Sequence, residues 1–62
     1  MEYSVLIEGE ENFFGDFEDV IDDVQNRTYF EVDAQDMAVW LPKMELGESV
    51  QLGDDCKITR IR

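Results

Sequence analysis

Residues 13–26 read FFGDFEDVIDDVQN and carry the clearest periodic pattern in the chain. Apolar side chains recur there at spacings of three and four residues, at Phe17, Val20, Ile21 and Val24. In an α-helix this spacing gathers them into one stripe, which Phe13 or Phe14 extends. We therefore predict a helix over residues 13–26 that packs on the rest of the protein through this stripe.

The other side of this predicted helix is acidic. Five carboxylates fall within eight residues, at Asp16, Glu18, Asp19, Asp22 and Asp23. At a rise of about 1.5 Å per residue, the row holds one charge per roughly 2.4 Å. That density lies between the values for both strands and for one strand of duplex DNA, about 1.7 and about 3.4 Å per charge. The carboxylates repel one another at i+3 and i+4, so the row costs stability and indicates a use beyond solubility.

The whole chain shares this acidity. Its 62 residues include 16 Asp and Glu, 5 Lys and Arg and no His, for a net charge of −11, and the first 26 residues contribute −9 of it. With 44% hydrophobic residues we expect a folded chain, and its length allows one compact domain over residues 1–62. Nucleic acids and anionic membranes repel such a protein, whereas a basic protein surface attracts it. We expect a basic partner.

β-type runs flank the predicted helix. Residues 3–7 read as a strand, followed by an acidic loop over residues 8–12, and residues 28–32 read as another strand. Residues 48–52 and 56–61 read as a hairpin around the turn 53–55, although Ile61 falls out of phase with Cys56 and Ile58.

Residues 33–41 fit two structures. The stretch 33–36 suits the cap of a short helix that ends at Pro42, or the turn of a hairpin between residues 28–32 and 37–41. We favour the hairpin, because β-branched and aromatic residues suit paired strands and proline ends a strand without cost. These residues are Tyr29, Phe30, Val39 and Trp40.

The predicted fold is α+β, with one amphipathic helix packed on a small antiparallel sheet of about four to five short strands. The sheet side of the core is predicted to hold Tyr3, Val5, Ile7, Phe30, Val32, Val39, Val50, Leu52 and Ile58.

Catalysis and metal binding find no support in the sequence. Without histidine the usual nucleophilic triads are excluded, and the single cysteine, Cys56, has no base beside it and reads as a small buried strand residue. Residues 8–19 do not fit the calcium-loop pattern. We expect no enzyme activity, no cofactor and no metal. One cysteine allows no internal disulfide, and without a signal peptide or a long apolar run we expect a cytoplasmic protein.

Residues 47–58, GESVQLGDDCKI, resemble the early strand-turn-strand of the carbon storage regulator family of RNA-binding proteins. The resemblance implies a hairpin. The basic residues with which that family binds RNA have no counterparts in this chain, so we interpret the likeness as a shared hairpin and expect no direct nucleic-acid binding.

In overall character the chain resembles the small acidic phage-encoded proteins that block host defence, including DNA-mimic anti-CRISPR and anti-restriction proteins. The resemblance implies inhibition by occupying a nucleic-acid-binding surface of a Cas effector or a restriction enzyme in the host cytoplasm. The candidate partner-binding residues are Glu8, Glu10, Glu11, Asp16, Glu18, Asp19, Asp22, Asp23, Asp33 and Asp36.

Three alternatives stay open. In the first, the protein is an assembly module that binds through an apolar patch around Trp40, Leu41 and Met44. In the second, it is an antitoxin-like regulator that masks a basic partner. In the third, its acidic residues form a solvated face and bind no partner.

Overall fold

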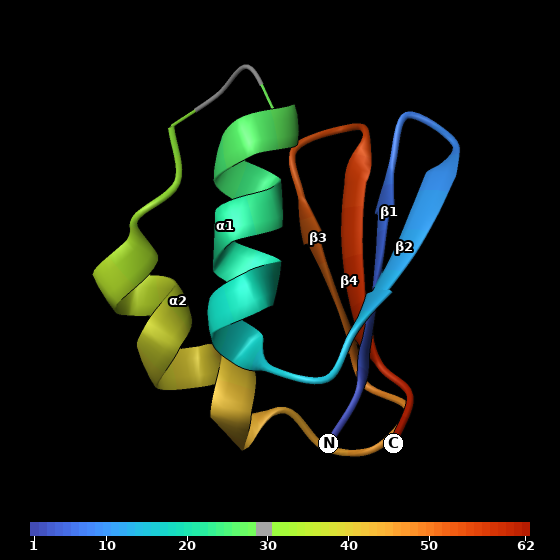
Figure 1. Ribbon diagram of the computed structural model, residues 1–62, viewed down its shortest axis with the longest axis vertical. Helices are drawn as coiled ribbons and strands as arrows, with labels where there is room; N and C mark the ends of the chain where they lie inside the picture. The colour runs from blue at the N-terminus through green and yellow to red at the C-terminus, as the bar shows by residue number, and fades with distance from the viewer. Residues whose placement is uncertain (29–30) are drawn as a thin grey trace.

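A computed structural model describes residues 1–28 and 31–62 of the chain. It shows a four-stranded antiparallel sheet in the order β2-β1-β4-β3, with two helices against one face (Figure 1). In chain order the elements are β1 (Tyr3–Ile7), β2 (Glu10–Phe14), α1 (Phe17–Arg27), α2 (Ala34–Trp40), a 3-10 turn (Leu41–Lys43), β3 (Ser49–Leu52) and β4 (Cys56–Arg60). The α+β prediction is confirmed, with a second helix besides the predicted one.

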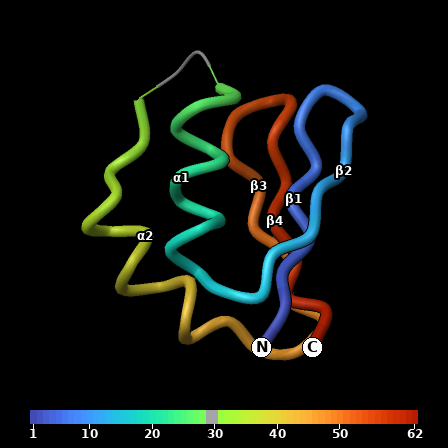
Figure 2. Tube along the Cα trace, in the orientation of Figure 1, coloured from blue at the N-terminus to red at the C-terminus, as the bar shows by residue number. Residues whose placement is uncertain are grey.

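The first and last strands, β1 and β4, lie side by side in the middle of the sheet (Figure 2). Both chain termini therefore lie at one end of the molecule, and the turns of the two hairpins lie at the opposite end (Figure 1). Among the described elements, no helix is long and apolar enough to cross a membrane.

A tight turn joins β1 to β2, where we predicted an acidic loop over residues 8–12. Ile7 pairs with Glu10, so only Glu8 and Gly9 form the turn, and both have positive φ, 51° and 81°. Two positive φ values define the type I′ turn, whose twist matches that of paired strands. The loop prediction is wrong because pairing with β1 holds this acidic segment extended, although its residues are weak strand formers.

Helix α1 begins at Phe17, four residues later than predicted, because residues up to Phe14 belong to β2. The carboxylate of Asp16 caps it by accepting from the backbone N–H of Glu18 at 3.2 Å. The stripe predicted from Phe17 to Val24 is confirmed, since Val20, Ile21 and Val24 are buried and Phe17 packs partly buried beside them. Its predicted extension by Phe13 or Phe14 is wrong, because both residues lie on β2.

Helix α2 covers Ala34–Trp40, so the hairpin prediction for residues 33–41 is wrong and the helix alternative is confirmed. The side chain of Asp33 accepts from the N–H groups of Gln35 and Asp36 at 3.0 and 3.2 Å and caps α2. Pro42 then stands in the 3-10 turn that follows. Helical spacing buries Met37 and Leu41, and this burial outweighs the β-propensity of the segment.

The strand predicted over residues 28–32 is also wrong where it is described, since Thr28, Glu31 and Val32 lie outside any strand. Tyr29 and Phe30 fall outside the described residues, so the prediction of Phe30 as core is not addressed. Val39 is 57% exposed on α2, which corrects its placement in the core.

The C-terminal hairpin is confirmed as β3 and β4. A type II turn with Gly47 at φ +86° leads into β3. Gly47 and Glu48 both lie opposite Arg60. The N–H of Gly47 donates to the carbonyl oxygen of Arg60 at 2.8 Å, and the N–H of Arg60 donates to the carbonyl oxygen of Glu48 at 3.0 Å. Two residues opposite one define a β-bulge. Ile61 lies beyond β4 and is exposed, which resolves its phase conflict.

The core lies between the sheet and the two helices. Its buried members are Tyr3, Val5, Ile7, Val20, Ile21, Val24, Met37, Leu41, Met44, Cys56 and Ile58. Val32, Val50 and Leu52 of the predicted core are partly buried around it. The predicted burial of Cys56 is confirmed. The hydroxyl of Tyr3 donates to the carbonyl oxygen of Leu41 at 3.0 Å and so ties the sheet to the 3-10 turn.

Candidate functional site

The exposed side of α1 carries three carboxylates, Glu18, Asp19 and Asp22, which we call the α1 acidic face. They lie opposite the buried stripe and are solvent-exposed. From Glu18 to Asp22 the helix rises about 6 Å, in steps of about 1.5 Å to Asp19 and about 4.5 Å to Asp22, so the mean rise per charge is roughly 3 Å. The mean charge density along the axis is close to that of the phosphates of one DNA strand, one per about 3.4 Å, although the steps are unequal.

Other members of the predicted acidic row have tasks within the fold. Asp16 and Asp33 are helix caps. The carboxylate of Glu11 accepts a hydrogen bond from the hydroxyl of Ser4 on the neighbouring strand. Asp36 lies exposed in the first turn of α2, on another helix than the α1 acidic face, and lines a cavity together with Trp40 and Leu52. The structure therefore does not gather all ten predicted residues on one surface.

Asp23 is held by Arg27 in a two-pronged ion pair. The Nε and Nη2 atoms of Arg27 donate to the two carboxylate oxygens of Asp23 at 2.8 and 2.6 Å. The guanidinium also donates to the backbone carbonyls of Glu10 and Val5, each at 3.4 Å. The hydrogen bond that Arg27 donates to Asp23 is the main cause that raises the pKa of Arg27. This pair fastens the last turn of α1 to β1 and β2, so Asp23 is not a free surface charge.

The two hairpin turns bring together acids that are far apart in the sequence. The N–H of Glu8 donates to the carbonyl oxygen of Asp55 at 3.0 Å, so Glu8, Asp54 and Asp55 share one end of the molecule with the C-terminus of α1 (Figure 1). Asp54 and Asp55 are not among the residues predicted to bind a partner. The antiparallel order that places both turns at one end could have revealed them.

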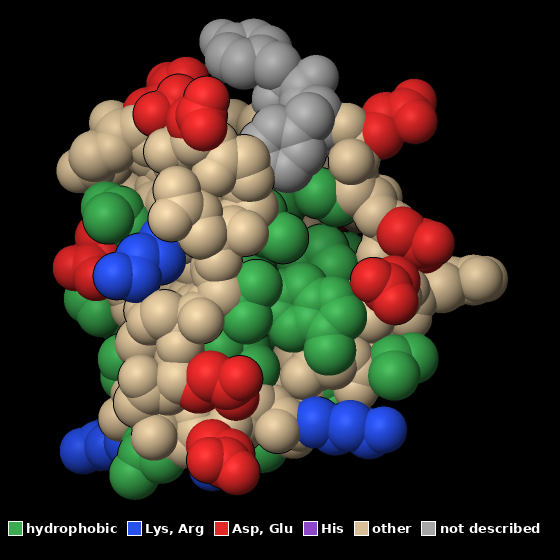
Figure 3. Space-filling model, turned by 180° about the vertical axis from the view of Figure 1, so that it is seen from behind, with side chains coloured by type: hydrophobic (Ala, Val, Ile, Leu, Met, Phe, Trp, Pro, Cys, Tyr) green, Lys and Arg blue, Asp and Glu red, His purple; other side chains and the backbone are tan. Residues whose placement is uncertain are grey.

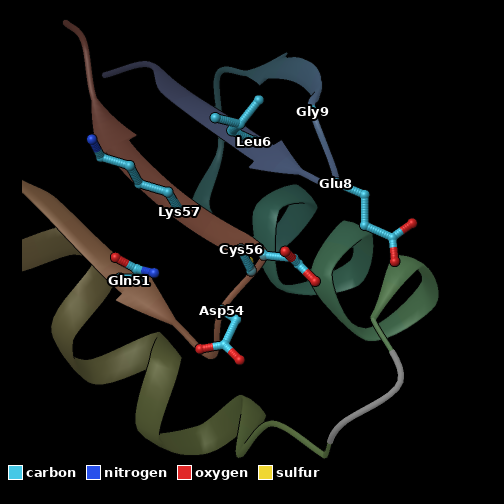
Figure 4. A pocket seen from close by; sticks show the side chains of 8 residues that line it. Leu6, Glu8, Gly9, Gln51, Asp54, Cys56 and Lys57 are labelled. Atoms are coloured by element: carbon cyan, nitrogen blue, oxygen red, sulfur yellow. The ribbon is translucent and has the colours of Figure 1, made fainter.

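A shallow hollow of about 300 Å³ lies at this end, beside Lys57. Figure 4 shows that the Glu8 and Asp54 carboxylates point away from each other instead of converging. The described residues contain no cluster of His, Cys, Asp or Glu arranged to hold a metal ion. The acids of this end therefore present charge outward and form no cage for a cation.

The cations gather at the other end. Lys43 follows α2, and Arg60 and Arg62 end the chain beside the N-terminus (Figure 1). Arg60 Nη1 donates to the carbonyl of Met44 at 2.7 Å, and Arg62 pairs with Glu2 at 3.6 Å. Acids lie at this end as well, because Glu2 pairs with Arg62 and because α1 begins here, with Glu18 and Asp19 in its first turn. The negative charge therefore extends along α1 from one end of the molecule to the other.

The apolar patch considered as an alternative does not lie on the surface. Leu41 and Met44 are buried in the core, and only Trp40 is partly exposed. Trp40 instead lines a groove between α2 and β3, together with Val50 and Leu52.

Cys56 is poorly suited to act as a nucleophile. Its side chain is buried on β4, and burial raises the pKa of the thiol, so the thiolate is disfavoured. Comparisons with protein-family models, with curated proteins and with solved structures found no match for the chain.

Proposed function

We propose that the protein is a non-enzymatic inhibitor that binds the basic, nucleic-acid-binding surface of another protein and thereby excludes the nucleic acid. The observation that carries this proposal is the α1 acidic face, whose mean charge density along the helix axis is close to that of the phosphates of one DNA strand. A groove built to hold phosphates can accept this row of carboxylates in their place. The compositional resemblance stated above makes a Cas effector or a restriction enzyme the first target class to test.

The exposed carboxylates on one side of α1 support a defined binding orientation. The α1 acidic face would turn toward a basic partner first. Long-range attraction of this kind raises the association rate and falls with ionic strength. The proposal therefore requires binding that depends strongly on salt.

Inhibition in this proposal is stoichiometric. The chain has no histidine, and its single cysteine is buried with a raised thiol pKa. One inhibitor molecule is accordingly expected to silence one target molecule.

The test is a titration of the protein into DNA-cleavage reactions of purified Cas effectors and restriction enzymes. The D19N/D22N variant removes two charges from the α1 acidic face, and D36N/E45Q removes two charges elsewhere on the surface. We expect inhibition to saturate near one protein per target, to be lost in D19N/D22N and to persist in D36N/E45Q. Inhibition far below one protein per target, or equal effects of the two variants, would contradict the proposal.

A further inference from the structure

The two edges of the sheet are protected differently. The edge strand β2 carries Glu10 and Glu11, and the side chain of Arg27 contacts the backbone carbonyl of Glu10. The other edge strand, β3, reads Ser-Val-Gln-Leu and has no charge and no proline. Proteins usually guard a free edge with charges, prolines or a covering element, because its unpaired backbone groups accept another strand. The β3 edge lacks the first two of these guards.

The backbone groups of β3 that face outward follow from its pairing with β4. The carbonyl oxygen of Glu48 accepts from the N–H of Arg60 on β4. Val50 and Leu52 lie two and four residues further along the strand, so their backbone groups also face β4. In an antiparallel pair alternate residues bond to the partner strand, so Ser49 and Gln51 direct their N–H and C=O groups away from β4. Within the described chain, no other strand pairs with this edge.

An apolar groove runs beside the same edge. Two cavities of about 410 and 280 Å³ share Trp40 and Leu52 and together follow the space between α2 and β3. Figure 3 shows this region as a continuous hydrophobic area with acidic side chains around it. Its floor includes Val32, Met37, Met44 and Val50. Every second side chain of a strand added to β3 would point into this groove.

The rim of the groove selects for positive charge. Glu31, Asp33, Asp36 and Glu48 line it, against the single cation Lys43. A second copy of this chain carries −11 and is repelled. We propose that the groove between α2 and β3 binds an extended basic segment of a partner protein, which pairs with the β3 edge, places alternate apolar side chains against Trp40 and directs Lys or Arg to the acidic rim. This inference uses a surface separate from the α1 acidic face and does not rest on the proposed function.

The test uses the peptide Lys-Lys-Val-Thr-Leu-Thr-Val-Lys-Lys and the fluorescence of Trp40, the only tryptophan in the chain. Binding should produce a saturable blue shift of the emission, because the apolar side chains cover the partly exposed indole. The same peptide with Glu in place of every Lys should produce none. Absence of a shift with the basic peptide would overturn the proposal, as would a protein dimer that covers Trp40 without peptide.

Two N-methylated isomers of the peptide test strand pairing without altering the protein. One carries methyl groups on the amides of Val and Leu, the other on those of Thr, so each isomer blocks one edge of the extended peptide. We expect one isomer to bind like the parent and the other to bind about tenfold more weakly or worse. Equal behaviour of the two isomers, whether both bind or neither does, would overturn strand addition.

The acidic rim is tested by a matched pair of variants. D36N removes a charge from the rim, and D22N removes one from the α1 acidic face. D36N should weaken peptide binding about two- to fivefold, the range of an exposed ion pair, and D22N should leave it nearly unchanged. Equal weakening by both variants would show that net charge, and not the rim, attracts the peptide.

Discussion

Neighbouring aspartates on α1 should respond to the same substitution in opposite directions. Asp22 is exposed and is repelled by Glu18 and Asp19, at i−4 and i−3, so D22N should stabilise the protein by about 0.3–1 kcal/mol. Asp23 is different, because its side chain is only 13% exposed and it binds Arg27 through two hydrogen bonds. Hydrogen bonds to charged groups contribute about 1.5–3 kcal/mol, and the amide of D23N retains part of this, so we expect a loss of about 1–2 kcal/mol.

Thermal unfolding followed by circular dichroism at neutral pH and low salt measures both effects. For a domain of this size about 1 kcal/mol shifts the Tm by roughly 4–8 °C, so D23N should lower it by roughly 5–15 °C while D22N raises it by a few degrees. Added salt should shrink the gain of D22N. Equal shifts of the same sign would refute the structural distinction between the two carboxylates and return Asp23 to the exposed row.

Three further predictions follow from the fold. Asp33→Ala should lower the free energy of unfolding, measured in urea, by about 1 kcal/mol, because α2 loses the side chain that accepts from two N–H groups at its start. An unchanged urea midpoint would contradict the capping role. Gly47→Ala should lower the free energy of unfolding by about 1–2 kcal/mol, because its φ of +86° is unfavourable for alanine even though nothing lies within 4 Å of the added Cβ. Gly15→Ala should be tolerated, and equal stabilities of the two variants would contradict the turn. Stability should fall as the pH rises through about 9 to 10, because burial raises the pKa of Cys56 and of Tyr3 above their ordinary values of 9.0 and 10.0, so the unfolded chain releases these protons first. Urea midpoints should show a shallower alkaline loss in Tyr3→Phe than in the parent, and identical profiles would refute the contribution of Tyr3.

The elements predictable from the sequence are those decided by local pattern. The stripe of α1 follows from the spacing of Val20, Ile21 and Val24, and the C-terminal hairpin follows from two β-rich runs around one turn. Strand β2 could not be predicted in this way, because pairing with β1 holds Glu10 and Glu11 extended against their own propensity.

Helix α2 shows a conflict between two local signals. Asp33 and Pro42 mark the start and end of a helix, whereas Val39 and Trp40 favour a strand. The caps prevailed because the helix buries Met37 in the core, a tertiary contact that propensity does not report.

The candidate site was predictable in composition but not in detail. The exposed members of the α1 acidic face follow from their position opposite the apolar stripe. The partners of the other acids come from distant residues, since Ser4 reaches Glu11 across the sheet and the turns join Glu8 to Asp55. Such contacts depend on strand register, which the sequence left undetermined around β2.

Competition between this protein and duplex DNA or RNA for one purified inhibited target tests directly whether the acidic surface replaces nucleic acid. Affinity is measured at increasing nucleic acid concentration, and again from about 0.05 M to about 0.5 M salt, where the screening length falls to a few ångströms. We predict that nucleic acid raises the apparent Kd in proportion to its concentration and that salt weakens binding steeply, with a shallower salt dependence for D19N/D22N. A complex that forms equally well on the nucleic-acid-bound target and at about 0.5 M salt would contradict the proposal.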